Sequence, residues 1–97
     1  MRKVQDMELQ FETHRIFLTD DTGKTVAEIT FPEIAPGVVD IDHTFVDGSL
    51  RGKGVAGRLA AAAVKLIRAN GWKMKASCSY AAGWLEKHPA EKDLLAE

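Results

Sequence analysis

A glycine-rich, basic stretch, residues 51–57, runs directly into an alanine-rich segment and constrains the fold of this chain more than any other feature. Alanine and leucine dominate residues 55–70 and no proline interrupts them, which predicts a helix. The glycines let the backbone come close to a ligand. Unpaired N–H groups of the first helical turn then face the stretch and form an anion site. Arg51 and Lys53 add positive charge that fits a diphosphate; the alternative is a solvated basic pair.

Two well-known phosphate-binding folds do not fit this chain. A P-loop needs a glycine ahead of Gly-Lys-Ser/Thr, and Gly23-Lys24-Thr25 lacks it. Residues 52–57 do match G-x-G-x-x-G, the fingerprint of dinucleotide-binding folds. That fold also needs further strands and helices, and too little chain follows the predicted helix to supply them.

The first part of the chain predicts an antiparallel hairpin. Residues 7–12 alternate apolar and polar side chains, and residues 15–19 form a second β-prone run, so the two are either one bent strand or two strands. Residues 20–24 form a polar turn, and residues 26–31 return as the partner strand. Prolines at 32 and 36 break the pattern.

Residues 38–46 form the strongest predicted strand, which leads through a turn at 47–49 to the glycine-rich stretch. Strict alternation separates its side chains onto two faces. One face carries Val39, Ile41, His43 and Phe45, and the other carries Asp40, Asp42, Thr44 and Val46.

The chain after the long helix predicts one more strand and one more helix. Asn70-Gly71 ends the helix, residues 72–78 form a strand, and Ser79 caps a helix over residues 80–88 that Pro89 halts. The tail is frayed or forms a short extra turn. The expected fold class is α/β in the α+β sense: a mixed, mostly antiparallel sheet with one long helix and a shorter C-terminal helix.

Length and charge limit the classes of function. Ninety-seven residues suit a single domain over 1–97, with a core over about residues 7–90. A net charge of −1 gives no general attraction to nucleic acid or to an anionic membrane. Cys78 is the only cysteine, so no internal disulfide is expected and a reducing cytoplasm is the expected setting. We expect no secretory signal, no membrane span and no metal site.

The motif Arg51-x-x-Gly54-x-Ala56 resembles the R/Q-x-x-G-x-G/A motif of the GNAT superfamily of N-acetyltransferases. The strand before it and the helix, strand and helix after it match that family's order. Further short motifs resemble the very short stand-alone GNAT-like proteins: His43-Thr44, Cys78-Ser79-Tyr80, Trp84-Leu85 and His88-Pro89. The resemblance covers about residues 14–90.

The resemblance implies a minimal GNAT-like fold and acetyl-CoA as cosubstrate, with its pyrophosphate held by backbone N–H groups of residues 51–56. The implied cofactor-binding residues are Phe45, Val46, Arg51, Gly52, Lys53, Gly54, Val55 and Ala56. The expected function is acetyl transfer to an amine on a small molecule or protein, by a monomer or weak dimer. The alternative is a CoA-binding or protein-interaction module without turnover. A nucleic-acid partner is disfavoured because no aromatic residues lie among the basic ones.

Three residues are candidates for the chemistry. His43 is the candidate base, since imidazole accepts a proton near neutral pH; the alternative is a buried ring hydrogen-bonded among apolar neighbours. Cys78 is an acyl acceptor or a proton donor to the CoA thiolate, or else a small buried hydrophobe. Tyr80 is an alternative acid, in line with a tyrosine of larger GNAT enzymes, or else a packing residue.

Overall fold

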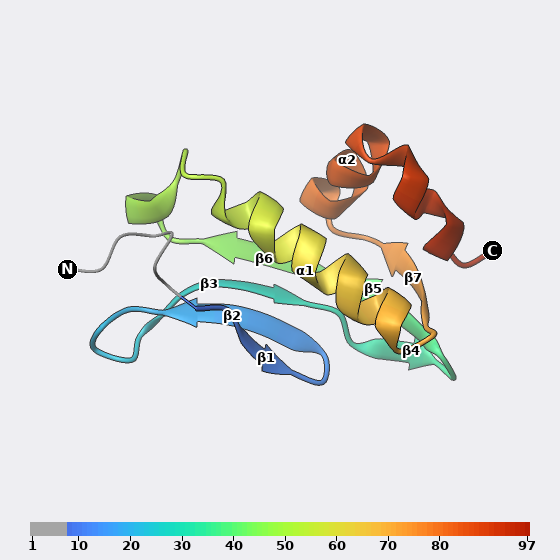
Figure 1. Ribbon diagram of the computed structural model, residues 1–97, viewed down its shortest axis with the longest axis horizontal. Coiled ribbons are helices and arrows are strands. Elements are labelled where there is room, and N and C mark those ends of the chain that lie inside the picture. The colour runs from blue at the N-terminus through green and yellow to red at the C-terminus, as the bar shows by residue number, and fades with distance from the viewer. Residues whose placement is uncertain (1–7) are drawn as a thin grey trace.

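Two small sheets form the floor of the molecule and one long helix lies across them (Figure 1). The computed structural model describes residues 8–97. The antiparallel sheet has the order β1-β2-β3-β6, and the second sheet has the order β4-β5-β7 with β5 and β7 parallel. Their bounds are Gln10–Glu12 (β1), Arg15–Thr19 (β2), Thr25–Thr30 (β3), Glu33–Ala35 (β4), Val38–Ile41 (β5), His43–Val46 (β6) and Lys73–Ala76 (β7). This is the α+β fold class expected from the sequence.

The first hairpin forms as the sequence predicts, and β1 and β2 are two strands rather than one bent strand. β2 and β3 pair antiparallel around the predicted turn. In that turn the Asp20 carboxylate accepts hydrogen bonds from the backbone N–H of Thr22 at 2.9 Å and of Lys24 at 3.1 Å. The part of the first alternating run that precedes residue 8 lies outside the described residues.

The prediction of a single strand over residues 38–46 is wrong, because the chain passes from one sheet to the other at Asp42. β5 pairs with β7, whereas β6 pairs with β3. The Asp42 N–H donates to the Thr30 carbonyl at 3.2 Å, and Thr30 also lies opposite His43. Two residues therefore face one, which is the geometry of a β-bulge.

The bulge also reverses the faces of β6. Val39 and Ile41 are buried, but His43 and Phe45 are exposed, and Val46 packs against the core instead. The expected common face of these residues is thus wrong beyond Ile41. One inserted residue has this effect because strand side chains alternate with a period of two.

A further difference is β4, a short edge strand that the sequence did not predict. It lies between the two prolines at 32 and 36 and pairs antiparallel with β5. Proline is tolerated at the ends of edge strands, so the same residues that break the pattern also flank a strand.

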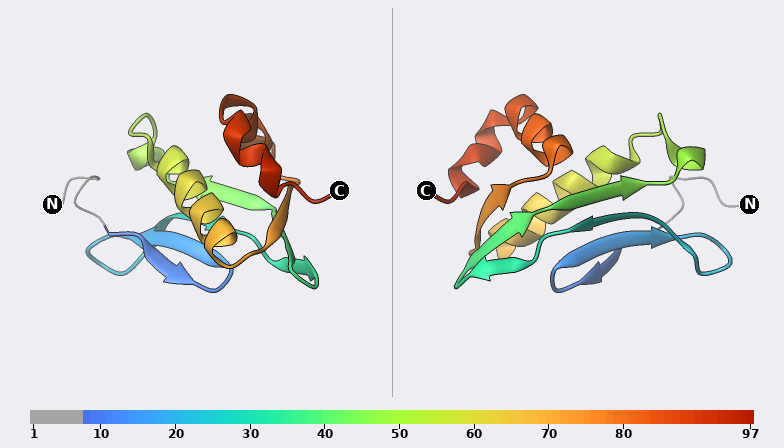
Figure 2. Two further views of the ribbon diagram at one scale, coloured as in Figure 1. Left: turned by 45° about the vertical axis from the view of Figure 1, so that its right-hand side comes forward. Right: turned by 180° about the vertical axis from the view of Figure 1, so that it is seen from behind.

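Helix α1, Val55–Ala69, packs on β2, β3 and β6, as predicted for the alanine-rich segment. Gly71, at φ +72°, follows the helix where a stop was expected. The core lies between α1 and the sheets, and its largest fully buried side chains are Phe31, Ile16, Leu18, Ile29, Ile41, Leu59, Ile67 and Met74. Among the described residues, all helices lie on one side of the sheets, and the outer face of the antiparallel sheet is bare (Figure 2).

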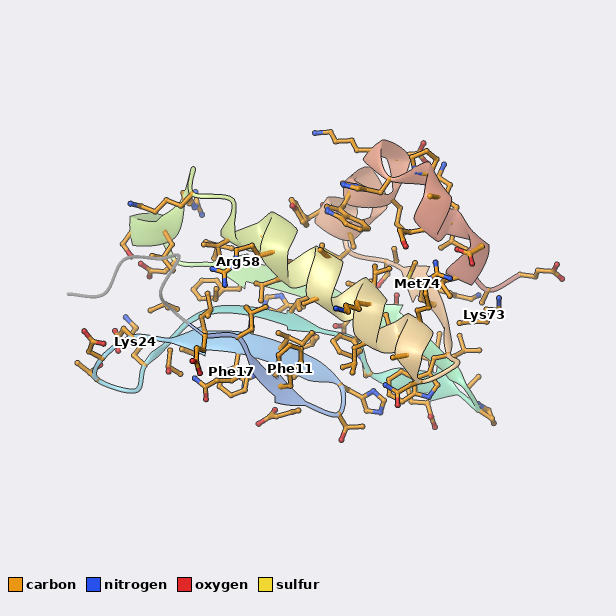
Figure 3. All side chains as sticks on the ribbon, in the orientation of Figure 1. Phe11, Phe17, Lys24, Arg58, Lys73 and Met74 are labelled. Atoms are coloured by element: carbon orange, nitrogen blue, oxygen red, sulfur yellow. The ribbon has the colours of Figure 1, made fainter. Side chains whose placement is uncertain are left out.

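The C-terminal part forms α2, Ser79–Lys87, and a 3-10 helix η3, Pro89–Leu94. The predicted helix is confirmed, with Cys78 rather than Ser79 at its N-cap. Of the two alternatives expected for the tail, the short extra turn is confirmed by η3 and fraying is not. The Ala96 N–H donates at 2.8 Å to the carbonyl of Met74, which is labelled in Figure 3, and Leu94 is buried. Over residues 8–97, no helix has the length and apolarity to cross a membrane.

Candidate functional site

A hollow of about 190 Å³ opens at the N-terminus of α1. Its walls come from β6, from a 3-10 turn η2 (Gly48–Leu50), from the glycine-rich stretch and from the start of α2. The lining residues are Val46, Leu50, Arg51, Gly52, Gly54, Val55, Ala56, Gly57 and Tyr80. The tertiary structure thus brings the predicted anion loop together with a tyrosine more than 20 residues further along the chain.

The backbone of the loop depends on two of its glycines. Gly52 has φ +78° and Gly54 has φ +74°, in the left-handed region that L side chains rarely adopt. A β-carbon at either position would meet no protein atom within 4 Å. The requirement for glycine is therefore conformational, and the space in front of both residues is open.

The first turn of α1 has unpaired hydrogen-bond donors. Gly54 is the N-cap and has no side chain to cap the helix. The first bond of the helix runs from the Arg58 N–H to the Gly54 carbonyl at 3.1 Å. Within residues 8–97, the N–H groups of residues 55–57 make no hydrogen bond. These donors, with the positive end of the helix dipole, form an anion site.

Basic and acidic side chains flank this site. Arg51 lines the hollow, whereas Lys53 is exposed beside it and does not line it. At the start of the loop, the Asp47 carboxylate accepts from the Ser49 hydroxyl at 2.5 Å and from the Ser49 N–H at 3.0 Å. These bonds lower the pKa of Asp47 and hold it as the cap of η2. The carboxylate is thus engaged within its own turn.

Tyr80 forms the wall of the hollow opposite α1. A β-carbon built on Gly57 would lie 3.7 Å from the Tyr80 hydroxyl oxygen, so this hydroxyl lies close to the first turn of α1. Partial burial raises the pKa of Tyr80. A phenol is protonated at neutral pH, so Tyr80 has a proton that it can donate.

Cys78 lies at the N-cap of α2, where β6 and the end of β7 part. Its Sγ is 3.6 Å from the Thr44 Oγ1, and its N–H donates to the Ile41 carbonyl at 3.0 Å. Burial opposes ionisation of the thiol, but hydrogen bonds from the Ala81 N–H, the Thr44 hydroxyl and the Tyr80 N–H outweigh it and lower the pKa of Cys78. The thiol is therefore more readily ionised than an ordinary cysteine.

His43 and Phe45 lie on the opposite face of β6. The His43 side chain is 54% exposed, and its Nε2 lies 3.6 Å from the Glu28 Oε2. Phe45 is 39% exposed and does not line the hollow. Since Thr44 is the β6 residue that contacts Cys78, the structure does not bring His43 and Cys78 to the same face of the sheet.

The structure therefore gathers most of the predicted site and adds residues that the sequence did not reveal. Val46, Arg51, Gly52, Gly54, Val55, Ala56 and Tyr80 line the hollow. Leu50 and Gly57 complete it: Leu50 directly precedes the glycine-rich stretch and Gly57 is its last residue, so adjacency to the implied cofactor-binding residues 51–56 was a usable signal. Thr44 belongs to the His43-Thr44 motif, but its contact with Cys78 could not be predicted because it depends on the bulge. Among residues 8–97, no three His, Cys, Asp or Glu side chains are grouped to hold a metal ion.

Comparison with known proteins gives a consistent result. A profile of the family described as GCN5-related N-acetyl-transferase matches residues 15–94, which is most of the chain. A solution structure of a GCN5-like candidate N-acetyltransferase from Staphylococcus aureus is 33% identical, with a TM-score of 0.76 over 96% of this chain and 91% of that one. No curated protein matches significantly.

Larger proteins share the fold at lower identity. A GNAT family N-acetyltransferase from Escherichia coli, solved in complex with CoA, is 22% identical with a TM-score of 0.53, over 60% of this chain and 35% of that one. Ard1 from Thermoplasma volcanium is 20% identical with a TM-score of 0.61, over 77% of this chain and 53% of that one. This chain thus spans about half the length, or less, of these larger relatives.

Proposed function

This chain belongs to the GCN5-related N-acetyltransferase family, and on that premise we propose that it transfers an acetyl group from acetyl-CoA to an amine. The observation that carries the proposal is the hollow at the first turn of α1, whose walls include the glycine-rich loop and Tyr80. The acceptor is an amine on a small molecule or on a protein.

Residues 51–56 hold the diphosphate of acetyl-CoA in this proposal. The unpaired N–H groups at the start of α1 support the assignment, since each is free to donate to a phosphate oxygen. Arg51 supplies positive charge at the rim, and Val46 supplies an apolar wall. Open space in front of Gly52 and Gly54 allows the ligand to approach the backbone. The residues present thus fit a diphosphate.

On the inner face of β6, Tyr80 is the candidate acid. Transfer of the acetyl group leaves a CoA thiolate that needs a proton, and the Tyr80 phenol, whose pKa is raised by burial, holds one at neutral pH. Cys78 is the second candidate, as a proton donor or as an acyl acceptor, and its lowered pKa favours the acceptor role.

On the outer face, His43 is the candidate base for the amine. An amine that approaches from the bare side of the sheet meets the exposed His43 ring, whose Nε2 lies 3.6 Å from the Glu28 Oε2. In this proposal His43 acts on the outer face of β6, whereas Thr44 and Cys78 meet on its inner face.

Calorimetric titration with acetyl-CoA tests the proposal, because absence of binding at millimolar ligand removes it. Release of free thiol in the presence of small amines, polyamines and lysine peptides then tests turnover. Tyr80→Phe, Cys78→Ala and His43→Ala should each lower turnover by on the order of a hundredfold where the residue acts directly, with unchanged acetyl-CoA affinity for His43→Ala. Phe45→Ala, which changes the same outer face, is the matched control for His43.

The second candidate function is a CoA-binding or protein-interaction module without turnover. The length of the chain supports this second function, since the match covers only 53% of Ard1 and 35% of the Escherichia coli protein. Larger relatives have chain to spare for enclosing an acceptor, whereas the outer sheet face of this protein is bare (Figure 2). Binding of acetyl-CoA without thiol release for any amine selects this function.

A further inference from the structure

The ladder between β5 and β7 contains one extra residue on the β7 side, just before Cys78. At the start of the ladder, the Lys73 N–H donates to the Gly37 carbonyl at 2.9 Å. At its end, the Cys78 N–H donates to the Ile41 carbonyl at 3.0 Å. The two acceptors are four residues apart in the chain, whereas the two donors are five apart. Since the register is regular along both strands, the extra residue is Ser77, which lies between the end of β7 and Cys78.

Ser77 gives its hydrogen bonds to the side chain of Asp40 instead of to the ladder. In a regular parallel ladder the Ser77 N–H would donate to the Ile41 carbonyl, which the Cys78 N–H occupies. The Ser77 N–H donates to the Asp40 Oδ1 at 2.9 Å, and the Ser77 hydroxyl donates to the Asp40 Oδ2 at 2.6 Å. Both carboxylate oxygens of Asp40 are therefore engaged by the residue that leaves the ladder.

Cys78 takes the place in the ladder that Ser77 leaves, and it is also the N-cap of α2. Its carbonyl accepts from the Ala82 N–H at 3.0 Å, and its Sγ lies 3.6 Å from the Thr44 Oγ1. Burial opposes ionisation of the thiol, but hydrogen bonds from the first N–H groups of α2 and from the Thr44 hydroxyl outweigh it and lower the pKa of Cys78. The position of Cys78 therefore controls how readily its thiol ionises.

We propose that Asp40 positions Cys78, by holding Ser77 outside the ladder so that residue 78 begins α2 beside Thr44. Asp40 is a positioning residue that acts through Ser77. The inference rests on the proposed function for its bearing on acetyl transfer, in which Cys78 is a candidate proton donor or acyl acceptor. The reactivity of the thiol itself is measurable without acetyl-CoA.

A direct effect of the Asp40 charge on the thiol would have the opposite sign. A nearby carboxylate disfavours a thiolate, so removal of its charge should lower the pH at which Cys78 ionises. Loss of the positioning contact should instead raise that pH, because the thiol loses its alignment with the donors that stabilise the thiolate. The titratable side chains on the segments that bond to this turn are Asp40, Asp42, His43, Lys75 and Tyr80, and of these only Asp40 bonds to Ser77.

Alkylation of Cys78 by iodoacetamide over a pH series tests the proposal. Cys78 is the only cysteine, so the measured rate reports this thiol alone. Asp40→Ala should raise the pH midpoint of alkylation by about one unit, which is about tenfold less thiolate at a fixed pH below the midpoint. Asp40→Asn keeps the shape of the side chain and its capacity to hydrogen-bond to Ser77, and should stay close to wild type.

Asp42→Ala is the matched control. It removes the neighbouring carboxylate, which accepts from the Thr30 hydroxyl at 2.5 Å instead of from Ser77, and should leave the midpoint unchanged. An unchanged or lower midpoint in Asp40→Ala overturns the proposal. An equal rise in Asp40→Asn also overturns it, because that variant retains hydrogen-bonding groups for Ser77.

Ser77→Ala provides a second measurement in case Asp40→Ala does not fold, as monitored by circular dichroism. It removes only the hydroxyl bond to Asp40 and keeps the N–H bond. The midpoint should therefore rise by a smaller amount than in Asp40→Ala. An unchanged or lower midpoint in Ser77→Ala overturns the proposal.

The outcomes separate this proposal from the proposed function. A raised midpoint in Asp40→Ala, with no thiol release from acetyl-CoA by the wild-type protein, supports the positioning role and removes acetyl transfer. Thiol release by the wild-type protein, with an unchanged midpoint in Asp40→Ala, keeps acetyl transfer and overturns the positioning role.

Discussion

Gly54→Ala distinguishes a ligand-binding role of the glycine-rich loop from a purely conformational one. Gly54 has φ +74°, and Gly71, after the far end of α1, has φ +72°. A β-carbon would meet no protein atom within 4 Å at either position. Gly71→Ala is therefore a matched control with the same backbone strain at a residue that does not line the hollow.

The expected effects follow from this match. A non-glycine residue in the left-handed region costs about 1–2 kcal/mol, so both variants should lose that much stability, at roughly 4–8 °C of Tm for each kcal/mol. Only Gly54→Ala places a methyl group at the wall of the hollow. Loss of one charge-assisted hydrogen bond to the diphosphate costs about 1.5–3 kcal/mol, which is roughly a 10- to 150-fold weaker Kd.

Calorimetric titration of both variants with acetyl-CoA, beside thermal unfolding monitored by circular dichroism, measures the two effects separately. A ligand-binding role of Gly54 predicts that the two variants melt alike and that only Gly54→Ala binds acetyl-CoA weakly. Equal affinities for acetyl-CoA in the two variants would refute it, because the close backbone approach at Gly54 would then be irrelevant to binding.

Three further predictions concern the neighbours of the site and the C-terminal tail. Thr44→Val should shift the pH midpoint of Cys78 alkylation by iodoacetamide upward, because the Thr44 hydroxyl lowers the thiol pKa; an unchanged midpoint would remove that role. Gly57→Ala should raise the free energy of unfolding by about 0.4–1 kcal/mol in urea titration, since Gly57 is helical and the new methyl makes only ordinary contact; a decrease contradicts this. The Arg68 hydrogen bond lowers the pKa of Asp93 below 3.8, so the stabilisation is present above that pH and lost as pH falls through the folded-state pKa. When urea titrations are repeated at decreasing pH below about 4, the free energy of unfolding should therefore fall less in Arg68→Gln than in the wild type, and an equal fall in both would contradict this.

The elements that depend on local chemistry could be predicted from the sequence. The helix after the loop, its stop at Asn70-Gly71 and the helix before Pro89 all form where propensity and turn residues placed them. The loop itself was recognisable because positive φ at Gly52 and Gly54 is a property of those residues. The short flanking additions to the hollow, Leu50 and Gly57, lie next to it in the chain.

The pairing of the candidate catalytic residues could not be predicted in this way. Alternation placed His43 with Val39 and Ile41, but the bulge at Asp42 turns it to the outer face and brings Thr44 to Cys78. The packing of the tail on Met74 was hidden because it depends on a strand edge formed by a distant segment. β4 was hidden for another reason: its partner β5 is next in the chain, but the prolines at 32 and 36 break the strand pattern on either side of it.

The sequence by itself determined the loop, the helices and the family, because glycine conformation, helix propensity and proline act over a few residues. Only the tertiary structure decided which face each side chain of residues 38–46 occupies. That choice depends on β5 pairing with β7 while β6 pairs with β3, and one residue inserted where the strand changes partners reverses every side chain that follows.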